Sequence, residues 1–226
     1  DLKALGYDPR VYNKPHPALD PAQAPEFMAV LRQQESIAFR ALELVVLTGL
    51  REGEVSAAQW SEIDLEAALW TIPAERLKDR LHRKQPHRIP LSNRALKIIR
   101  SLKGRDNEWV FPGLGNDKSI APQSILEALK KLNVDKHGKS IWLDPVSKKR
   151  IVVHGFRSTL RTWAEEHGFR REAAEESLGH KIGNEVESRY RRTDILDERR
   201  KLLEAWARYC STPKTYAQVI PINKKR

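Results

Sequence analysis

Five polar residues in the C-terminal third of the chain have the types and the order expected of a site for one phosphodiester group. They are His154, Arg157, His180, Arg189 and Tyr190. Arginine forks bind the non-bridging oxygens of a phosphate bidentately. Histidine exchanges protons near neutral pH, and a tyrosine hydroxyl can attack phosphorus to form a covalent ester. The set therefore predicts covalent chemistry on a phosphodiester.

An earlier motif, TGLREGEV, adds Arg51 and Glu54. Arg51 follows the end of an apolar helix at Gly49, and an arginine beside a buried segment needs a partner because an unpaired buried charge is costly. Glu54 is the natural partner. Taken alone, this motif favours a structural Arg–Glu pair over a catalytic role.

The motif HGFR places His154 and Arg157 on one face of the first turn of a predicted helix. The start of a helix also offers free N–H groups and a positive dipole end, both of which suit an anion. Arg161 continues this polar face. The alternative is an N-terminal histidine with a solvated arginine, so the motif alone is a weak signal.

The motifs ESLGHKIG and VESRYRRTD supply the remaining candidates. His180 follows a helix stop, which would direct its imidazole away from the preceding helix. Tyr190 lies between Arg189 and Arg191, with few apolar neighbours at helical spacing, so it is predicted to face an anion. Tyr209, in contrast, shares a helical face with apolar residues and is predicted to pack.

A basic stretch joins two predicted strands across residues 77–86. Its basic residues are Lys78, Arg80, His82, Arg83 and Lys84, and Arg76 lies just before it. Most are expected to be solvated or to touch phosphates, with no catalytic role. One lysine at a strand end has the chemistry of a general acid, which protonates a leaving 5′ oxygen.

Composition narrows the class of partner. The formal net charge is +11, which favours a polyanion, although a basic protein whose charge only maintains solubility would look the same. No signal peptide or transmembrane stretch is visible, and a single cysteine fits a reducing cytoplasm. The seven histidines do not have the spacing of metal ligands, so we expect no metal. The sequence has no glycine-rich phosphate-binding loop, so we expect no nucleotide cofactor.

The hydrophobic periodicity predicts a mainly α fold with a small antiparallel β-sheet. Short strands are expected within 62–78 and 86–92. Helices are expected over residues 21–35, 36–50, 51–60, 93–104, 122–134, 155–168, 171–180, 184–192 and 194–210. Residues 1–20 are predicted to be a linker or arm, 21–210 the catalytic domain, and 211–226 a C-terminal tail that is unfolded or docks on a neighbouring protomer. The apolar stripe of Leu202, Leu203 and Trp206 is expected to dock on a neighbouring protomer or to fold back on its own domain.

Taken together and in this order, the motifs resemble the tyrosine recombinase (phage integrase) family, over about Ala18 to Tyr209 and in the style of prophage and genomic-island integrases. The resemblance implies that the catalytic residues are Arg51, Lys78, His154, Arg157, His180 and Tyr190, supported by Glu54. The hairpin is longer than usual, so Lys84 is the alternative lysine. The expected DNA-binding residues are Arg76, Arg80, Arg83, Lys84, Arg161, Arg189 and Arg191.

The resemblance also implies a function. Tyr190 would attack the scissile phosphate to give a 3′-phosphotyrosine and a free 5′ hydroxyl, during integration or excision of a mobile element. The implied partners are double-stranded attachment DNA, further protomers in a tetramer formed only on DNA, and accessory DNA-bending or directionality proteins, in the bacterial cytoplasm at the nucleoid. The only methionine is Met28, so an N-terminal DNA-binding domain is expected to precede this chain. The alternatives are a type IB topoisomerase and a non-catalytic DNA-binding protein.

Overall fold

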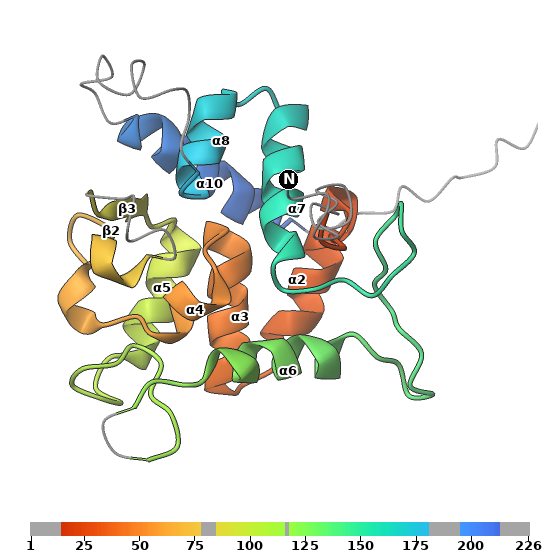
Figure 1. Ribbon diagram of the computed structural model, residues 1–226, viewed down its shortest axis with the longest axis horizontal. Helices are drawn as coiled ribbons and strands as arrows, with labels where there is room; N and C mark the ends of the chain where they lie inside the picture. Colours follow the sequence, from red (N-terminus) through yellow and green to blue (C-terminus); the bar gives the residue numbers. More distant parts are fainter. Residues whose placement is uncertain (1–14, 78–84, 116–117, 181–194, 213–226) are drawn as a thin grey trace, which may run out of the picture.

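A computed structural model describes residues 15–77, 85–115, 118–180 and 195–212 of the 226 residues. Figure 1 shows helices arranged around α3, with a small sheet at one edge. The helices are α2 (Ala24–Arg32), α3 (Ile37–Thr48), α4 (Glu52–Ser56), α5 (Asn93–Leu102), α6 (Pro122–Leu132), α7 (Gly155–Glu166), α8 (Arg171–Ser177) and α10 (Leu196–Tyr209), with short 3₁₀ helices η1 (Pro21–Gln23), η2 (Trp60–Glu62) and η3 (Ala74–Arg76). The predicted fold class, mainly α with a small antiparallel sheet, is confirmed.

Helix α3 forms the centre because its sequence is mostly apolar and residues 41–48 are all buried, as expected of a core helix. It packs against α2, α4, α5, α6, α7 and α10. Its one acid, Glu43, is fully buried and accepts hydrogen bonds from Arg32 (2.7 Å) and Arg94 (2.8 and 2.9 Å). Burial alone would raise the pKa of Glu43, but these two arginines outweigh it and hold the pKa below its usual value.

The sheet has the order β1–β2–β3, with β1 at Ile63–Asp64, β2 at Leu69–Ile72 and β3 at His87–Pro90. Trp70 pairs with Ile89 in the antiparallel β2–β3 ladder, and both side chains are buried. The predicted strands are therefore confirmed, but β2 ends earlier than expected. Pro73 lacks an N–H for the ladder, and the chain turns into η3 after it.

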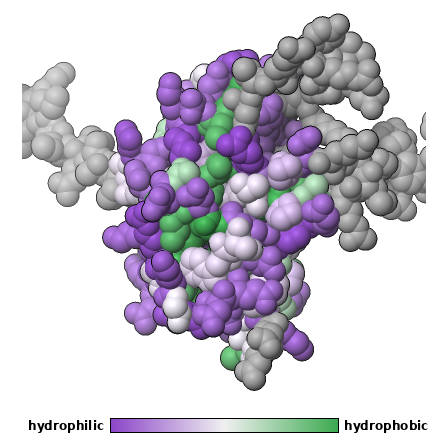
Figure 2. Space-filling view, turned by 90° about the vertical axis from the view of Figure 1, so that its left-hand side faces the viewer, coloured by the Kyte–Doolittle hydropathy of each residue, from purple (hydrophilic) through white to green (hydrophobic). Residues whose placement is uncertain are grey.

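The surface of the domain on the side of the sheet is mostly polar. Figure 2 shows hydrophilic side chains around one narrow apolar strip on this face. A surface of this kind suits an aqueous or charged neighbour better than a broad apolar partner.

Residues 15–20, predicted to belong to a linker, pack on the body of the domain. Leu19 is buried, its carbonyl accepts a hydrogen bond from Thr159 (2.7 Å), and the Ala18 amide donates to Asp144 (2.9 Å). Pro17 lies so close to α7 that a Cβ on Gly155 would come within 2.1 Å of the Pro17 carbonyl oxygen. The prediction for residues 1–14 lies outside the described residues.

Helix α10 folds back on its own domain. Trp206 is fully buried and its indole N–H donates to the Val46 carbonyl of α3 (2.8 Å). Tyr209, predicted to pack, contacts the ring of Trp163 and donates its hydroxyl to the Pro21 carbonyl (3.3 Å). The apolar stripe of α10 is thus used within the domain, and residues 213–226 of the predicted tail lie outside the described residues.

The contact of Pro17 with α7 predicts opposite effects for two helical glycines. Alanine is a better helix former than glycine by about 1 kcal/mol, and a Cβ at Gly53 meets no atom within 4 Å, so Gly53→Ala should raise the free energy of unfolding by up to about 1 kcal/mol. Gly155→Ala should lower it by about 1–3 kcal/mol, because the methyl group collides with Pro17. Urea unfolding measures both. Equal stabilisation by the two substitutions would show that residues 15–20 do not dock at Gly155.

Candidate active site

Arg157 holds three separate segments of the chain together. Its side chain is buried, and Nη1 donates to the Gly49 carbonyl at 2.6 Å, across 108 residues of sequence. Nη2 donates to the Leu178 carbonyl at 2.7 Å and lies 2.8 Å from Nε2 of His180. An arginine has five N–H donors, and these contacts use three, which leaves two for a ligand.

The position of Arg157 follows from the local sequence. It lies in the first turn of α7, between Phe156 and Leu160, which are both buried in the core. Burial, and next the charge of Arg51, lower the pKa of Arg157 to about 10. The guanidinium therefore stays charged at neutral pH, in surroundings where one added negative charge would be favourable.

Arg51 supplies a second guanidinium at the junction between α3 and α4. Its Nη1 donates to Glu54 at 2.9 Å, and the other oxygen of Glu54 accepts from the Arg51 backbone N–H at 2.9 Å. The predicted Arg–Glu pair is confirmed. Gly49 ends α3 with a φ of 67°, and a Cβ there would lie 2.6 Å from Leu178 Cδ2. Glycine at this position lets the chain turn and brings Arg51 and Leu178 to one place.

His154 immediately precedes α7 and is half-buried. Its ring centroid lies 4.4 Å from that of His16. Burial, and then the neighbouring charges of Arg157 and His16, lower the pKa of His154 to about 4. The imidazole is therefore neutral at pH 7 and has one nitrogen able to accept a proton or a hydrogen bond.

His180 completes the group of four described side chains. Nε2 faces Arg157, and Nδ1 lies 2.5 Å from Oε2 of Glu175. Glu175 was not among the residues predicted from the sequence. It also forms an ion pair with Arg161, with 2.8 Å between Oε1 and Nε. An acid five residues before His180, near the end of the preceding helix, was the signal available in the sequence.

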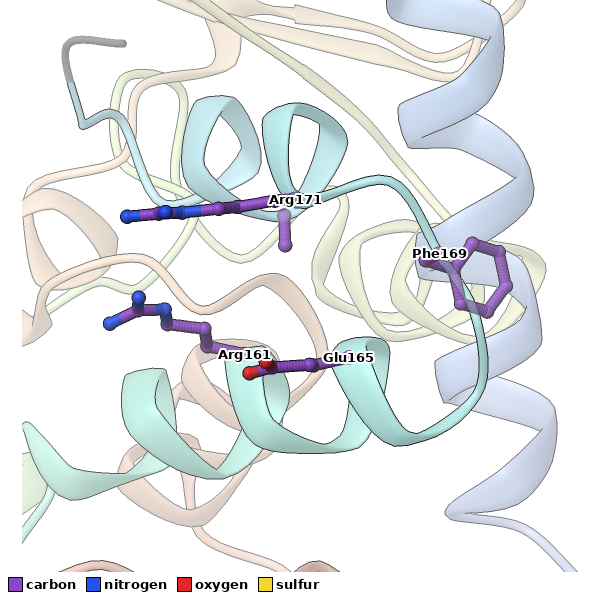
Figure 3. A pocket seen from close by; sticks show the side chains of 5 residues that line it. Arg161, Glu165, Phe169 and Arg171 are labelled. Atoms are coloured by element: carbon purple, nitrogen blue, oxygen red, sulfur yellow. The ribbon is translucent and has the colours of Figure 1, made fainter.

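Arginines also line the space between α7 and α8. Figure 3 shows Arg161 and Arg171 extending in the same direction from these two helices, with Glu165 and Phe169 further along the same pocket. Arg161 was predicted to bind DNA and Arg171 was not. Two guanidinium groups pointing the same way form a basic edge, and one of them, Arg161, pairs with Glu175.

Arg76, which was predicted to contact DNA, makes several contacts within the domain. Its guanidinium donates to the carbonyls of Ala57 and Glu54 and to the buried carboxylate of Glu62 (3.1 Å to Oε2). These contacts fix the start of the hairpin segment to the end of α4. Arg76 therefore has a structural role next to Glu54, because the buried carboxylate of Glu62 requires a nearby positive charge. A contact of Arg76 with DNA stays a prediction.

The remaining predicted site residues lie outside the described residues. They are Lys78, Arg80, Arg83, Lys84, Arg189, Tyr190 and Arg191. The described part of the chain contains no group of three or more histidine, cysteine, aspartate or glutamate residues placed to hold a metal ion. Among its helices, none has the length and apolar character needed to cross a membrane.

Comparison with known sequences gives one consistent family. The profile of the Phage integrase family matches residues 17–196. Prophage integrase IntA of Escherichia coli (strain K12) is 31% identical over 207 residues, which cover 88% of this chain and 46% of that protein. The integrase of Enterobacteria phage P4 is 31% identical over 209 residues, covering 86% and 45%. The chain thus spans about half the length of the curated relatives it matches.

Solved structures show the same fold at low identity. The integrase from mycobacterium phage Brujita aligns with a TM-score of 0.58 and 18% identity, covering 85% of this chain and 58% of that one. The Tn1549 transposon integrase in complex with transposon right end DNA aligns with a TM-score of 0.57 and 16% identity, covering 86% and 67%. A lambda integrase dimer bound to a COC' core site gives 0.53 and 16%, covering 79% and 61%.

The lowered pKa of His154 predicts a pH dependence of stability. The unfolded chain binds this proton near pH 6.5 and the folded chain only near pH 4. In between, the unfolded state binds more protons, so the free energy of unfolding should fall as the pH drops from about 6.5 to 4. His154→Gln should lose less stability between pH 7 and 5 than the wild type, as measured by urea unfolding. The exposed His137→Gln is the matched control, and an equal loss in all three proteins would contradict the neutral state of His154.

Proposed function

The chain belongs to the phage integrase family, as its motifs predict, and from this premise we propose that it is the catalytic domain of a tyrosine site-specific recombinase. Its proposed reaction is cleavage and rejoining of DNA strands through a 3′-phosphotyrosyl intermediate, in the integration and excision of a mobile element. Arginine, histidine, lysine and tyrosine side chains are sufficient for each step of this reaction on a phosphodiester.

One observation carries the proposal. Arg51, His154, Arg157 and His180 come from three distant parts of the sequence and meet at the contact of Arg157 with Gly49 and Leu178. Two of these groups are fixed cations, and His154 is a neutral imidazole. A preorganised pair of guanidinium groups is the arrangement that stabilises charge building up on a phosphoryl transition state.

In the proposed mechanism, Arg51 and Arg157 bind the non-bridging oxygens of the scissile phosphate. The hydroxyl of Tyr190 attacks phosphorus and loses its proton, while the bond to the 5′ oxygen breaks. His154 and His180 assist by hydrogen bonding and proton transfer, and Lys78, or Lys84 in its place, protonates the leaving 5′ oxygen. The energy of the broken bond is kept in the phosphotyrosine, and a 5′ hydroxyl of the partner strand reverses the step.

The proposed partners follow from the family and the charge. The lambda and Tn1549 integrases have been captured on DNA, the former as a dimer, which supports duplex attachment DNA and further protomers as partners here. We propose assembly to a tetramer on DNA, a monomer in its absence, accessory DNA-bending or directionality proteins, and action at the nucleoid in the bacterial cytoplasm. The basic edge of Arg161 and Arg171 supports a polyanionic partner.

The proposal predicts that covalent attachment to DNA depends on the hydroxyl of Tyr190. Tyr190→Phe removes only this oxygen, so the protein should fold and bind DNA but form no adduct. The assay incubates the chain with a nicked attachment-site duplex that traps the intermediate, followed by denaturing electrophoresis. Tyr209→Phe is the matched control, because the described Tyr209 hydroxyl bonds within the domain to Pro21, and it should retain adduct formation.

Adduct formation by Tyr190→Phe together with its loss in Tyr209→Phe would overturn the assignment. Relaxation of supercoiled plasmid of any sequence, without recombinant products, would instead identify a topoisomerase of type IB. DNA binding without any adduct in the wild type would identify a non-catalytic DNA-binding protein.

A further inference from the structure

Glu175 joins two of the candidate site residues through a single buried carboxylate. The residue lies in α8 and is only 9% exposed. Its Oε2 is 2.5 Å from Nδ1 of His180, and its Oε1 is 2.8 Å from Nε of Arg161. A carboxylate this buried requires compensation by charge or hydrogen bonds, and here each oxygen has its own partner. Its orientation is therefore fixed from two sides.

The contacts of His180 fix which of its ring nitrogens carries the hydrogen. Nη2 of Arg157 lies 2.8 Å from Nε2, and arginine can only donate. Nε2 must then accept, so in the neutral ring the hydrogen is on Nδ1 and donates to Glu175. Both contacts are satisfied in this tautomer, and the other would set two hydrogens against each other at Arg157.

We infer that Glu175 is a positioning residue that holds His180 in the Nδ1–H form, with Nε2 directed at the phosphate site beside Arg157. This inference rests on the proposed function. In the free chain Nε2 accepts the hydrogen bond of Arg157. A phosphate oxygen can only accept, so Nε2 contacts a bound phosphate after it has taken up a proton and the N–H group of Arg157 has turned to the phosphate. The charge of Glu175 stabilises the imidazolium that a proton on Nε2 would create, as carboxylates behind catalytic histidines do. Arg161 acts indirectly, because it holds the second oxygen of Glu175.

Two substitutions at Glu175 and one matched control test the inference. Glu175→Leu leaves the Nδ1–H group of His180 without its acceptor. Glu175→Gln keeps an acceptor oxygen but loses the charge, and its NH₂ group cannot pair with Arg161. Glu165→Gln removes the same charge from the pocket shared with Arg161, and the described contacts of the His180 ring do not include Glu165.

The first readout is the single-turnover rate of adduct formation on the nicked duplex. General acid–base groups contribute about 10²–10⁴ in rate, and part of the His180 contribution should be lost, so Glu175→Leu should be about 10–100-fold slower. Glu175→Gln should fall between Glu175→Leu and the wild type. Glu165→Gln should stay within about twofold, since single exposed charges contribute little. A wild-type rate for Glu175→Leu would overturn the inference.

A double-substitution cycle separates positioning from general damage to the fold. If Glu175 acts through His180, the variant carrying both Glu175→Leu and His180→Gln should be no slower than His180→Gln alone. If the fold-loss in rate of the double variant equals the product of the two single losses, Glu175 acts independently of His180, which would contradict the inference.

The second readout does not require DNA. The ¹⁵N chemical shifts of the His180 ring in the free chain at neutral pH, assigned with His180→Gln, report which nitrogen is protonated. The wild type should show protonated Nδ1. In Glu175→Leu only the contact with Arg157 still disfavours the other tautomer, so the fraction of the ring protonated at Nε2 should rise. Protonated Nε2 in the wild type, or no change in Glu175→Leu, would overturn the inference. Failure of every protein to form adduct would refute the proposed function, while this measurement would still test the contact of Glu175 with His180.

Discussion

A buried arginine requires partners for its charge and its N–H groups, and this requirement at Arg157 organises the candidate site. Its acceptors are the Gly49 carbonyl at the end of α3, the Leu178 carbonyl at the end of α8, and the ring of His180. Each belongs to a segment that also carries, or directly adjoins, another candidate residue. The same contacts that satisfy a costly buried charge therefore set the distances between the groups proposed to act on the phosphate.

The electrostatics around Arg157 leave the site prepared for one anion. Glu54 occupies one face of Arg51 and Glu175 lies behind His180, while His154 stays uncharged because burial and nearby positive charge disfavour its protonation. Glu54 thus orients the guanidinium of Arg51, and Glu175 orients the ring of His180. Donors of Arg157 that are not used by these contacts remain for a phosphate, so binding of DNA would complete a set of charges that the fold has already arranged.

The motifs found in the sequence identified the fold class and the family, because these features depend on side-chain type and spacing. They also pointed to Arg51, His154, Arg157 and His180, which the fold brings near one another and whose catalytic role stays a prediction. The anchors of Arg157 could not be predicted in the same way, since Gly49 and Leu178 contribute backbone carbonyls that any residue possesses. The contact of Arg76 with Glu62 could not be predicted either, because these residues lie 14 positions apart and the burial of Glu62 depends on the tertiary fold. The burial of Leu19 was not predicted, because the prolines around it are typical of linkers.

The most direct test of this account is the effect of Arg157→Lys on DNA cleavage and on DNA binding, measured with the same nicked duplex. Lysine keeps the charge but lacks the planar fork that contacts Gly49 and Leu178 together. The account predicts a loss of about 10²–10³ in the rate of adduct formation, with a much smaller loss in affinity, because many other basic residues share the contacts to the DNA backbone. Equal losses in rate and affinity, in a variant that remains folded, would show that Arg157 is an ordinary phosphate contact and would contradict the account.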